Sequence, residues 1–373
     1  MDFITIIIFL GIVQGFLIGI LLLTLKRGNI KANNFLGILM IIFSVSISGF
    51  LAGRIVTDPH YLFLVELPSS VILLIGPMFY FYVLALVKKD YKLDKKSVLH
   101  FIPFTMLIVF NLVFYLSNSG ETVIAEYSNM FSRLDRIMIG LQIIHVFIYT
   151  FFIKKILAEH QLKIKSTLSF TDNINLKWLN LTVVVLQMIF GMIALSIILL
   201  TAGINIESFL TTFIPVLVAL GILGLGYWGF KQPIIFPFES ENFKARKYEW
   251  STLSEEKADR SLDKLMFIMH DDRPYLDSGL TLQKLAEVVD ISPQHLSQII
   301  NERMNQNFFD FINGYRIKEA KRLLVDPKGE LLTILAIAEE VGFNSKSSFN
   351  TAFKKITGMT PTEYKKSVSL NNF

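Results

Sequence analysis

The sequence of 373 residues contains no cysteine. This absence excludes disulfide bonds and metal sites built on thiolates, and it carries no information about the cellular compartment. The sequence also lacks a phosphate-binding loop, a His-Glu-x-x-His pair and a nucleophile elbow, which are common signatures of catalytic sites. We therefore expect that the protein is not an enzyme and that it has no cofactor and no metal site.

Charged residues are scarce, at 18% of the sequence, whereas hydrophobic residues make up 52%. A soluble protein of this length could not bury so much apolar surface. The long apolar runs lie in residues 1–230, and charged residues become frequent after them. Basic and acidic residues are equally numerous after residue 230, so the net charge of +5 comes from the first part. The basic balance therefore reflects membrane topology and is no argument for nucleic acid.

Seven segments are apolar and long enough to cross a bilayer, which takes about 20 residues each. We expect these spans at about residues 3–25, 34–56, 63–87, 98–117, 133–157, 177–202 and 207–230. The fold class predicted from the sequence is all-α, with a polytopic membrane helical bundle of about seven spans followed by a second helical domain.

Lysine and arginine are missing from every second loop between these spans. The loops after the first, third and fifth spans are basic and include Lys26, Lys92 and Lys163, whereas the alternate loops contain no lysine or arginine. Short basic loops stay in the cytoplasm. We therefore expect a multi-pass protein of the inner (cytoplasmic) membrane, with its N-terminus outside and its C-terminal domain in the cytoplasm.

Polar residues within the spans are candidates for sensing. Because charge at membrane depth is costly, Arg54, Glu66 and His145 are the residues that we consider for pairing or ligand contact inside the bundle. The alternative is that Arg54 extends to the interface and that the uncharged groups form hydrogen bonds between helices. The latter set comprises Gln14, Asn111, Gln142, His145 and Gln187, and Gly221, Gly224 and Gly226 are expected to allow close helix approach. The outer loops are too short for a folded sensor, so an unknown small-molecule or protein stimulus must act on the bundle or through a partner.

The domain boundaries follow from composition. Residues 1–230 form the bundle, which is the candidate sensor, and residues 231–270 contain a proline-bounded linker and an amphipathic helix. The apolar face of that helix comprises Ala258, Leu262, Leu265, Met266 and Met269. We expect it to pack on the domain formed by residues 271–373, the alternative being a helix that forms a dimer or transmits a signal.

An internal repeat is the most informative feature of the C-terminal part. The run TLQKLAEVV that begins at Thr281 reappears from Thr333 as TILAIAEEV. In each copy the threonine can cap a short helix, and a tight turn at Asp290 or Gly342 leads to a second helix. The caps of the second helices are expected at Ser292 and at Asn344 or Ser345. This is the helix-turn-helix pattern.

A longer helix is predicted between the two copies, from Phe308 to Val325. At 1.5 Å per residue it spans about 27 Å. A rigid spacer of this length can hold two recognition helices about 34 Å apart, which is one turn of DNA.

Residues 253–368 resemble the DNA-binding domain of the AraC/XylS family of bacterial regulators. The first unit matches as TLQKLAEVVDISPQHLSQIINE, the spacer as NFFDFINGYRIKEAKRLL, and the second unit as TILAIAEEVGFNSKSSFNTAFKKITGMTPTEYKK. Gly342-Phe343, Gly358 and Thr360-Pro361 are typical of the second unit of the family, while Asp290 replaces the glycine common in the first. The resemblance implies sequence-specific binding of double-stranded DNA and transcription regulation.

The resemblance and the helical spacing together predict which side chains face DNA. Leu296, Ile299 and Ile300 are expected inside the first recognition helix, and Phe349, Ala352 and Phe353 inside the second. The candidate base contacts are Gln294, Ser297, Gln298, Lys346, Ser347, Asn350 and Thr351, and the candidate phosphate contacts are His295, Arg303, Lys318, Lys354 and Lys355. Because the domain is only slightly basic, we expect tight binding to need two protomers or adjacent sites, which makes a homodimer a candidate assembly.

The interpretation favoured by the sequence is a membrane-embedded, sequence-specific transcription regulator that couples a membrane or extracellular signal to promoter binding. Its partners are then double-stranded DNA and the lipid bilayer. An alternative is a membrane domain that only anchors the protein until proteolysis in the linker releases the DNA-binding domain. A transporter-like membrane domain is another alternative, although no repeat among the spans supports it.

Overall fold

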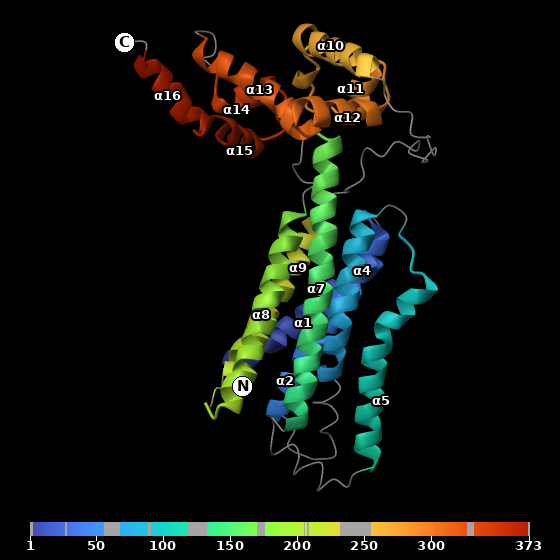
Figure 1. Ribbon diagram of the computed structural model, residues 1–373. Coiled ribbons are helices and arrows are strands. Elements are labelled where there is room, and N and C mark those ends of the chain that lie inside the picture. The colour runs from blue at the N-terminus through green and yellow to red at the C-terminus, as the bar shows by residue number, and fades with distance from the viewer. Residues whose placement is uncertain are drawn as a thin grey trace. The chain divides into compact units, whose positions relative to one another are not determined.

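The computed structural model describes residues 3–26, 28–55, 68–88, 91–117, 133–169, 176–204, 206, 209–231, 255–326 and 332–371. The chain divides into two compact units. Unit 1 comprises residues 1–158 and 176–237, and unit 2 comprises residues 159–175 and 238–373 (Figure 1). The described residues are helical apart from short connections and one isolated bridge between Leu168 and Thr281. The predicted all-α class is confirmed.

Unit 1 is built from long apolar helices. They are α1 (Phe3–Thr24), α2 (Ile30–Ile55), η2 (Ile72–Leu74), α4 (Ile75–Val87), η3 (Lys95–Phe101), α5 (Ile102–Ser117), α7 (Arg133–Thr167), α8 (Lys177–Thr201), the π-helix η4 (Phe209–Phe213) and α9 (Ile214–Lys231). Within the described residues, seven helical segments are long and apolar enough to cross a membrane, in agreement with the number predicted.

Helix α7 is longer than the span predicted for it. The apolar run suggested an end near residue 157, but the helix continues to Thr167, and its residues from Glu159 onward belong to unit 2. Residues 158–167 contain no glycine or proline, so nothing in the local sequence stops the helix where the apolar run ends. Lys163, which we expected in a loop, is therefore helical.

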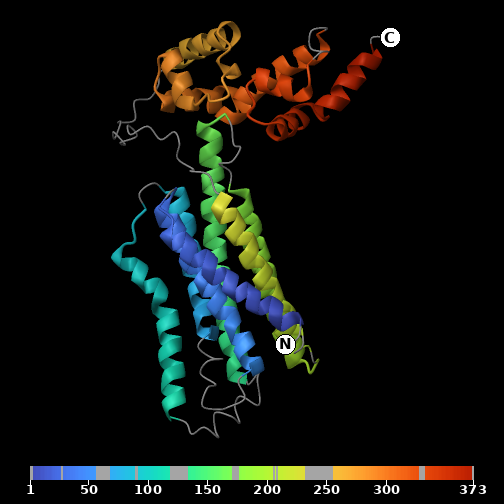
Figure 2. The ribbon, with the colours of Figure 1, turned by 180° about the vertical axis from the view of Figure 1, so that it is seen from behind.

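Helix α1 lies against α2 and α9 in unit 1 (Figure 2), and small residues on it allow close packing. A Cβ atom at Gly11 would collide with Ala219 of α9, and one at Gly15 would collide with Ser44 of α2. Because these glycines are four residues apart, they lie on one face of α1. Small side chains on one face are a common device for bringing membrane helices together.

Only one of the three glycines predicted to allow close approach in the last span does so within the described residues. A Cβ atom at Gly226 would collide with Ile18, whereas Gly221 and Gly224 face open space. The expectation for the latter two was wrong, because the helical period turns them away from the face that carries Gly226.

Several of the polar residues in the spans form hydrogen bonds between helices. The amide of Asn111 donates to Ser70 Oγ at 2.9 Å, and that of Gln142 donates to the Ser69 carbonyl at 3.3 Å. Gln187 donates a hydrogen bond to Thr150 at 3.0 Å and accepts one from Lys154 at 2.7 Å. The ring centre of His145 lies 4.8 Å from that of Tyr149. The side chain of Gln14 is exposed. The sensor candidates Glu66 and the side chain of Arg54 lie outside the described residues.

Unit 2 contains two helix-turn-helix pairs. Its further helices are α10 (Glu255–Asp271), η5 (Pro274–Leu276), α11 (Leu282–Val289), α12 (Pro293–Met304), α13 (Phe308–Val325), α14 (Ile334–Glu340), α15 (Lys346–Thr357) and α16 (Pro361–Asn371). Helices α11 and α12 form the first pair, and α14 and α15 form the second. The spacer helix α13 has the bounds predicted from the sequence.

The amphipathic helix α10 shares the core of the first pair. Leu265, Ile268 and Met269 are buried in one cluster with residues of α11 and α12. Their spacing of three and four residues places them on one helical face. Met266, which we assigned to that face, is 41% exposed, because the buried stripe runs through Ile268 instead.

Helix α13 contributes to the cores of both pairs. Phe308, Phe311 and Ile312 pack in the first cluster, and Ile317 and Leu324 pack in the second. A single helix of 18 residues therefore joins the two pairs.

Candidate nucleic-acid interface

All four helices of the two pairs begin at side-chain caps. Thr281 accepts a hydrogen bond from Lys284 N at 3.2 Å, and Thr333 accepts one from Ala336 N at 3.1 Å. The second helices are capped in the same way by Ser292, with Pro293 in the first position, and by Ser345. Each cap satisfies a backbone N–H group that has no partner within its helix.

The turns within the two pairs share a left-handed residue. Asp290 has φ 64° and Gly342 has φ 90°. The residue after each turn donates its backbone N–H back to the short helix, from Ile291 at 3.0 Å and from Phe343 at 2.8 Å. Aspartate tolerates this conformation because its side chain is short and polar.

The second helix of each pair buries the face predicted from the sequence. In α12, Leu296, Ile299 and Ile300 are at most 2% exposed. In α15, Phe349 and Phe353 are fully buried and Ala352 is 8% exposed. The opposite faces of both helices are thereby turned outward, and the two helices lie along the same side of unit 2 (Figures 1 and 2).

The candidate contact residues divide into two groups by exposure. Gln294, Gln298, Lys346, Ser347, Thr351 and Lys354 are exposed, as are Arg303, Lys318 and Lys355. His295, Ser297 and Asn350 are half-buried. The Oδ1 atom of Asn350 is buried and lacks a hydrogen-bond partner within the described residues.

Acidic neighbours already engage some of these side chains. Gln298 Nε2 donates to both carboxylate oxygens of Glu302 at 3.1 Å. Arg303 pairs with Asp259 of α10 at 3.1 Å. These contacts are on the surface, where ion pairs contribute about 0–1 kcal/mol, so a strong phosphate or base partner can replace them.

Sequence reasoning missed Arg316, which is 1% exposed in the middle of α13. Burial lowers the pKa of its guanidinium to about 10, which still leaves it charged at neutral pH. The position was detectable, because Arg316 lies four residues after Ile312 and four before Ala320, both on the buried face.

The described residues include no group of three or more His, Asp or Glu side chains placed to hold a metal ion. The chemistry available at the surface formed by α12 and α15 is hydrogen bonding by amides and hydroxyls and attraction by ammonium groups. Amides can read adenine, and lysine can contact guanine or phosphate.

Residues 285–367 match a family model described as "Helix-turn-helix domain". Over 91 residues the chain is 35% identical to YobQ of Bacillus subtilis, an uncharacterized HTH-type transcriptional regulator, covering 24% of this chain and 36% of that protein. It is 34% identical over 115 residues to the uncharacterized HTH-type transcriptional regulator SACOL0084 of Staphylococcus aureus, covering 31% of this chain and 14% of that protein. The chain thus spans about a third or less of the length of these relatives, and the similarity lies in a minor part of each protein.

Solved structures also align with part of the chain. The C-terminal domain of AraT, a response regulator from Geobacillus stearothermophilus, is 31% identical with a TM-score of 0.26, covering 29% of this chain and 84% of that one. The C-terminal domain of the two-component response regulator yesN from Fusobacterium nucleatum is 32% identical with a TM-score of 0.26, covering 28% of this chain and 98% of that one.

Proposed function

Since the C-terminal part of this chain carries an AraC-type helix-turn-helix domain, we propose that the whole protein is a membrane-embedded, sequence-specific transcription regulator. The observation that carries the proposal is the pair of capped helices α12 and α15, which bury matching apolar faces and turn polar faces outward. One continuous helix, α13, joins them. This arrangement suits two recognition helices that enter successive turns of the major groove.

Base recognition is assigned to the exposed polar face of each helix. In α12, Gln294, Ser297 and Gln298 supply amide and hydroxyl groups, and in α15 the first turn supplies Lys346 and Ser347. The N-terminal residues of a recognition helix are those that usually reach base edges. Asn350 and Thr351 remain proposed base contacts, and His295 and Lys354 are proposed phosphate contacts.

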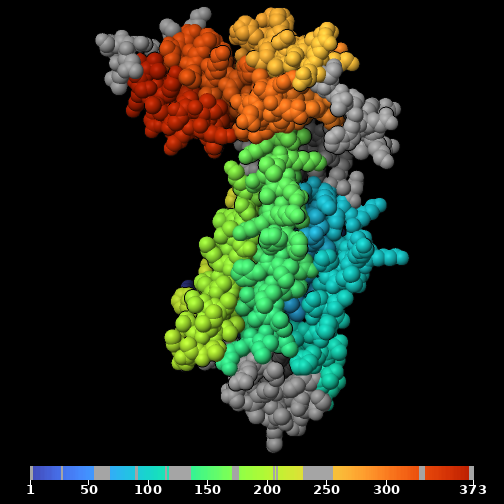
Figure 3. All heavy atoms as spheres, in the orientation of Figure 1, coloured from blue at the N-terminus to red at the C-terminus, as the bar shows by residue number. Residues whose placement is uncertain are grey.

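The membrane location is supported by the composition and exposure of unit 1. The side chains of α5 form a column at the edge of unit 1 (Figure 3), and Met106 and Leu116 are 68% and 73% exposed. Apolar side chains that are exposed along a whole helix are costly in water and favourable in lipid. With the basic alternate loops, this supports seven spans, an external N-terminus and a cytoplasmic DNA-binding domain.

The bundle is the proposed receiver of a membrane or extracellular signal. Its hydrogen bonds between helices, such as those that join Lys154, Gln187 and Thr150, provide packing that a stimulus could change. His145 is the one sensor candidate whose side chain the structure describes, and it lies beside Tyr149. Release by proteolysis is the alternative, and an immunoblot of stimulated cells that shows a soluble C-terminal fragment would favour it.

DNA occupancy by the intact protein tests the central proposal. Genome-wide occupancy should identify promoter fragments, and the purified full chain in lipid nanodiscs should then bind these fragments more tightly than scrambled duplexes of the same length. Equal affinity for both, at low salt and at several protein concentrations, would refute sequence-specific binding.

Topology is testable independently, because the chain has no cysteine. Lys257→Cys in α10 should react with an impermeant maleimide only after the inner membrane is permeabilised, and Glu121→Cys should react from outside. Labelling of Lys257→Cys in intact spheroplasts would contradict the cytoplasmic assignment.

A further inference from the structure

The end of α7 belongs to the unit that carries the helix-turn-helix pairs. This helix has 35 residues, or about 52 Å, whereas about 20 apolar residues cross a bilayer. Its apolar part gives way to a polar segment that includes Lys163 and Lys165. The fifth predicted span thus continues without a break into residues that are part of unit 2.

The two residues that follow α7, Leu168 and Ser169, are named the docking segment. The docking segment binds the connection before α11. Leu168 forms an antiparallel bridge with Thr281, the cap of α11. Ser169 Oγ donates to the Leu280 carbonyl at 2.7 Å, and Ser169 is 1% exposed. The docking segment is therefore held by backbone and side-chain bonds at the start of the first helix-turn-helix pair.

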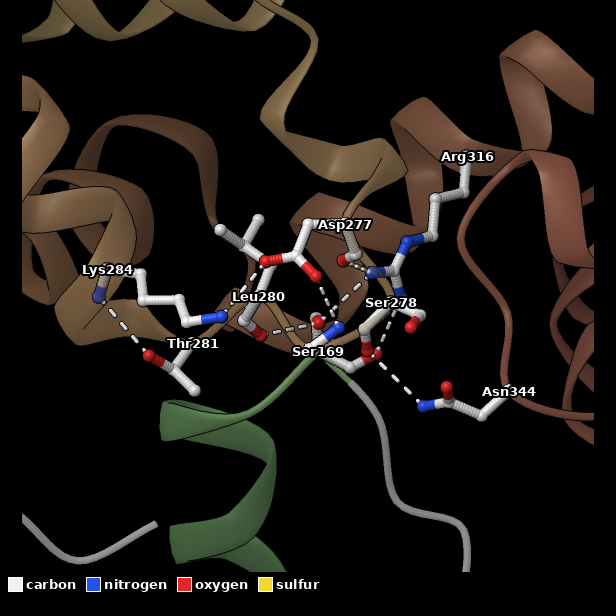
Figure 4. A network of polar contacts seen from close by, with 9 residues as sticks. Ser169, Asp277, Ser278, Leu280, Thr281, Lys284, Arg316 and Asn344 are labelled. Atoms are coloured by element: carbon white, nitrogen blue, oxygen red, sulfur yellow. Dashed lines mark hydrogen bonds and ion pairs between the residues drawn. The ribbon is translucent and has the colours of Figure 1, made fainter.

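The docking segment also supplies acceptors to the buried Arg316 (Figure 4). The guanidinium donates to the carbonyls of Tyr275 at 2.7 Å and Asp277 at 2.8 Å. It further donates to Ser169 twice, to the carbonyl at 3.0 Å and to Oγ at 3.2 Å. A buried charged donor that loses acceptors carries a large desolvation cost, so withdrawal of Ser169 would disturb the surroundings of Arg316.

Arg316 lies where the two helix-turn-helix pairs meet. Its guanidinium carbon is 5.6 Å from the ring centre of Phe343, which follows the turn of the second pair. A Cβ atom at Gly342 in that turn would come within 2.7 Å of the Tyr275 carbonyl. The connection before the first pair and the turn of the second pair thus contact each other around Arg316. This junction is a contact between the two pairs in addition to their shared packing on α13.

We propose that the docking segment is the contact through which the fifth span controls DNA binding. This inference rests on the function proposed above. When α7 shifts so that Ser169 leaves the junction, Arg316 loses two acceptors and the second pair loosens relative to the first. The docked form binds a promoter with both recognition helices, and the undocked form binds it less tightly.

A disulfide tests the docked arrangement in the full chain. Residues opposite each other in an antiparallel bridge have Cα atoms about 4.5–5.5 Å apart, which lies within the range of disulfides. Leu168→Cys with Thr281→Cys should oxidise within one molecule in membranes, seen as a shift on a non-reducing gel. Leu162→Cys with Thr281→Cys is the control, since Leu162 is 69% exposed on the preceding helix. Equal cross-linking of the two cysteine pairs would overturn the proposal.

A matched pair of serine substitutions tests the effect on DNA. Ser169→Ala removes the Oγ contacts to Leu280 and Arg316, whereas Ser166→Ala removes only a bond to Lys163 within α7. In nanodiscs, Ser169→Ala should weaken binding to an occupied promoter fragment about five-fold or more, the lower end of common allosteric couplings. Ser166→Ala should bind like the parent, and the oxidised cysteine pair should restore the affinity of Ser169→Ala.

The two proposals fail in different ways. If the parent prefers the promoter and Ser169→Ala has the same affinity, control through the docking segment is wrong while DNA binding stands. If the parent itself shows no preference for any duplex, the proposed function is wrong. The cross-linking result still reports whether docking occurs in that case.

Discussion

Lys355 of α15 donates from Nζ to the Asp310 carboxylate of α13 at 2.7 Å, and this ion pair ties the second recognition helix to the spacer. The preceding residue, Lys354, is exposed on the same helix. Two adjacent lysines therefore differ in how much of their charge is available to DNA.

We predict that Lys354→Ala reduces DNA affinity more than Lys355→Ala. A lysine that contacts phosphate contributes about one unit to the slope of log affinity against log salt. Lys354→Ala should lower that slope by about 1, and Lys355→Ala should lower it by less because Asp310 already partly neutralises this charge. Binding titrations at several salt concentrations measure both slopes, and the reverse order would contradict the assignment.

Base specificity should depend on one residue from each recognition helix. Gln298→Ala and Lys346→Ala should each shift or weaken site preference by about 1–3 kcal/mol at the contacted base pair. Lys264→Ala, on the exposed side of α10, is the control and should leave the preference unchanged. Affinities for a set of single-base variants of the promoter provide the measurement. A uniform loss across all variants would indicate phosphate contact instead.

The turn of the second pair should tolerate alanine poorly. Gly342 and Gly358 both have positive φ, at 90° and 80°, but only Gly342 is crowded, by the carbonyls of Tyr275 and Leu276. Gly358→Ala should cost about 1 kcal/mol from backbone strain, and Gly342→Ala should cost clearly more. Thermal unfolding of a fragment covering residues 255–371, followed by circular dichroism, compares the two. Equal costs would mean that the turn can move away from Tyr275.

The core of the second pair should depend on Phe349, which is fully buried in α15. Phe349→Ala should destabilise the fragment by about 3–5 kcal/mol, because it leaves a cavity in the cluster around Phe353. Ile356→Ala is the control on the same helix, since Ile356 is 49% exposed and its truncation should cost little. Urea titration of both variants measures the difference, and a small effect of Phe349→Ala would refute the packing described.

Acid should weaken unit 2 through Glu319. The hydrogen bond from Arg322, aided by the charges of Arg322 and Arg273, lowers the pKa of Glu319 below its ordinary value of 4.5. A carboxylate with a lowered folded-state pKa stabilises the fold above its unfolded pKa, and this stability is lost as the pH falls through the folded value. Glu319→Gln should therefore cost about 0.5 kcal/mol at pH 7 and progressively less below pH 4.5. Glu340→Gln, at an exposed position, is the control.

The sequence allowed the seven spans and the spacer helix to be predicted because both depend on local patterns. A run of about 20 apolar residues has few other structures available to it, and the spacer Phe308–Val325 is bounded by a capping Asn307 and by Asp326-Pro327. The buried faces of α12 and α15 follow from helical spacing in the same way.

The roles of Ser169 and Arg316 could not be predicted, because they depend on a contact between residues far apart in the chain. Hydropathy detects where a membrane span ends but not whether the helix continues beyond it, so the sequence predicts a loop where residues 158–167 are helical. Ser169, which follows the polar end of α7, is part of no sequence motif that would indicate its contacts. The helical spacing places Arg316 on the buried face of α13, but its acceptors include backbone carbonyls that only the folded chain brings together.

The spacer α13 restricts the promoters that both helix-turn-helix pairs can occupy at once. Because one helix is packed into both hydrophobic clusters, the distance between the two helix-turn-helix pairs along the duplex is set by the length of that helix. Inserting about five base pairs between the half-sites would turn one of them to the opposite side of the double helix. Inserting a full turn would restore the phase but move the second half-site beyond the reach of a spacer of fixed length.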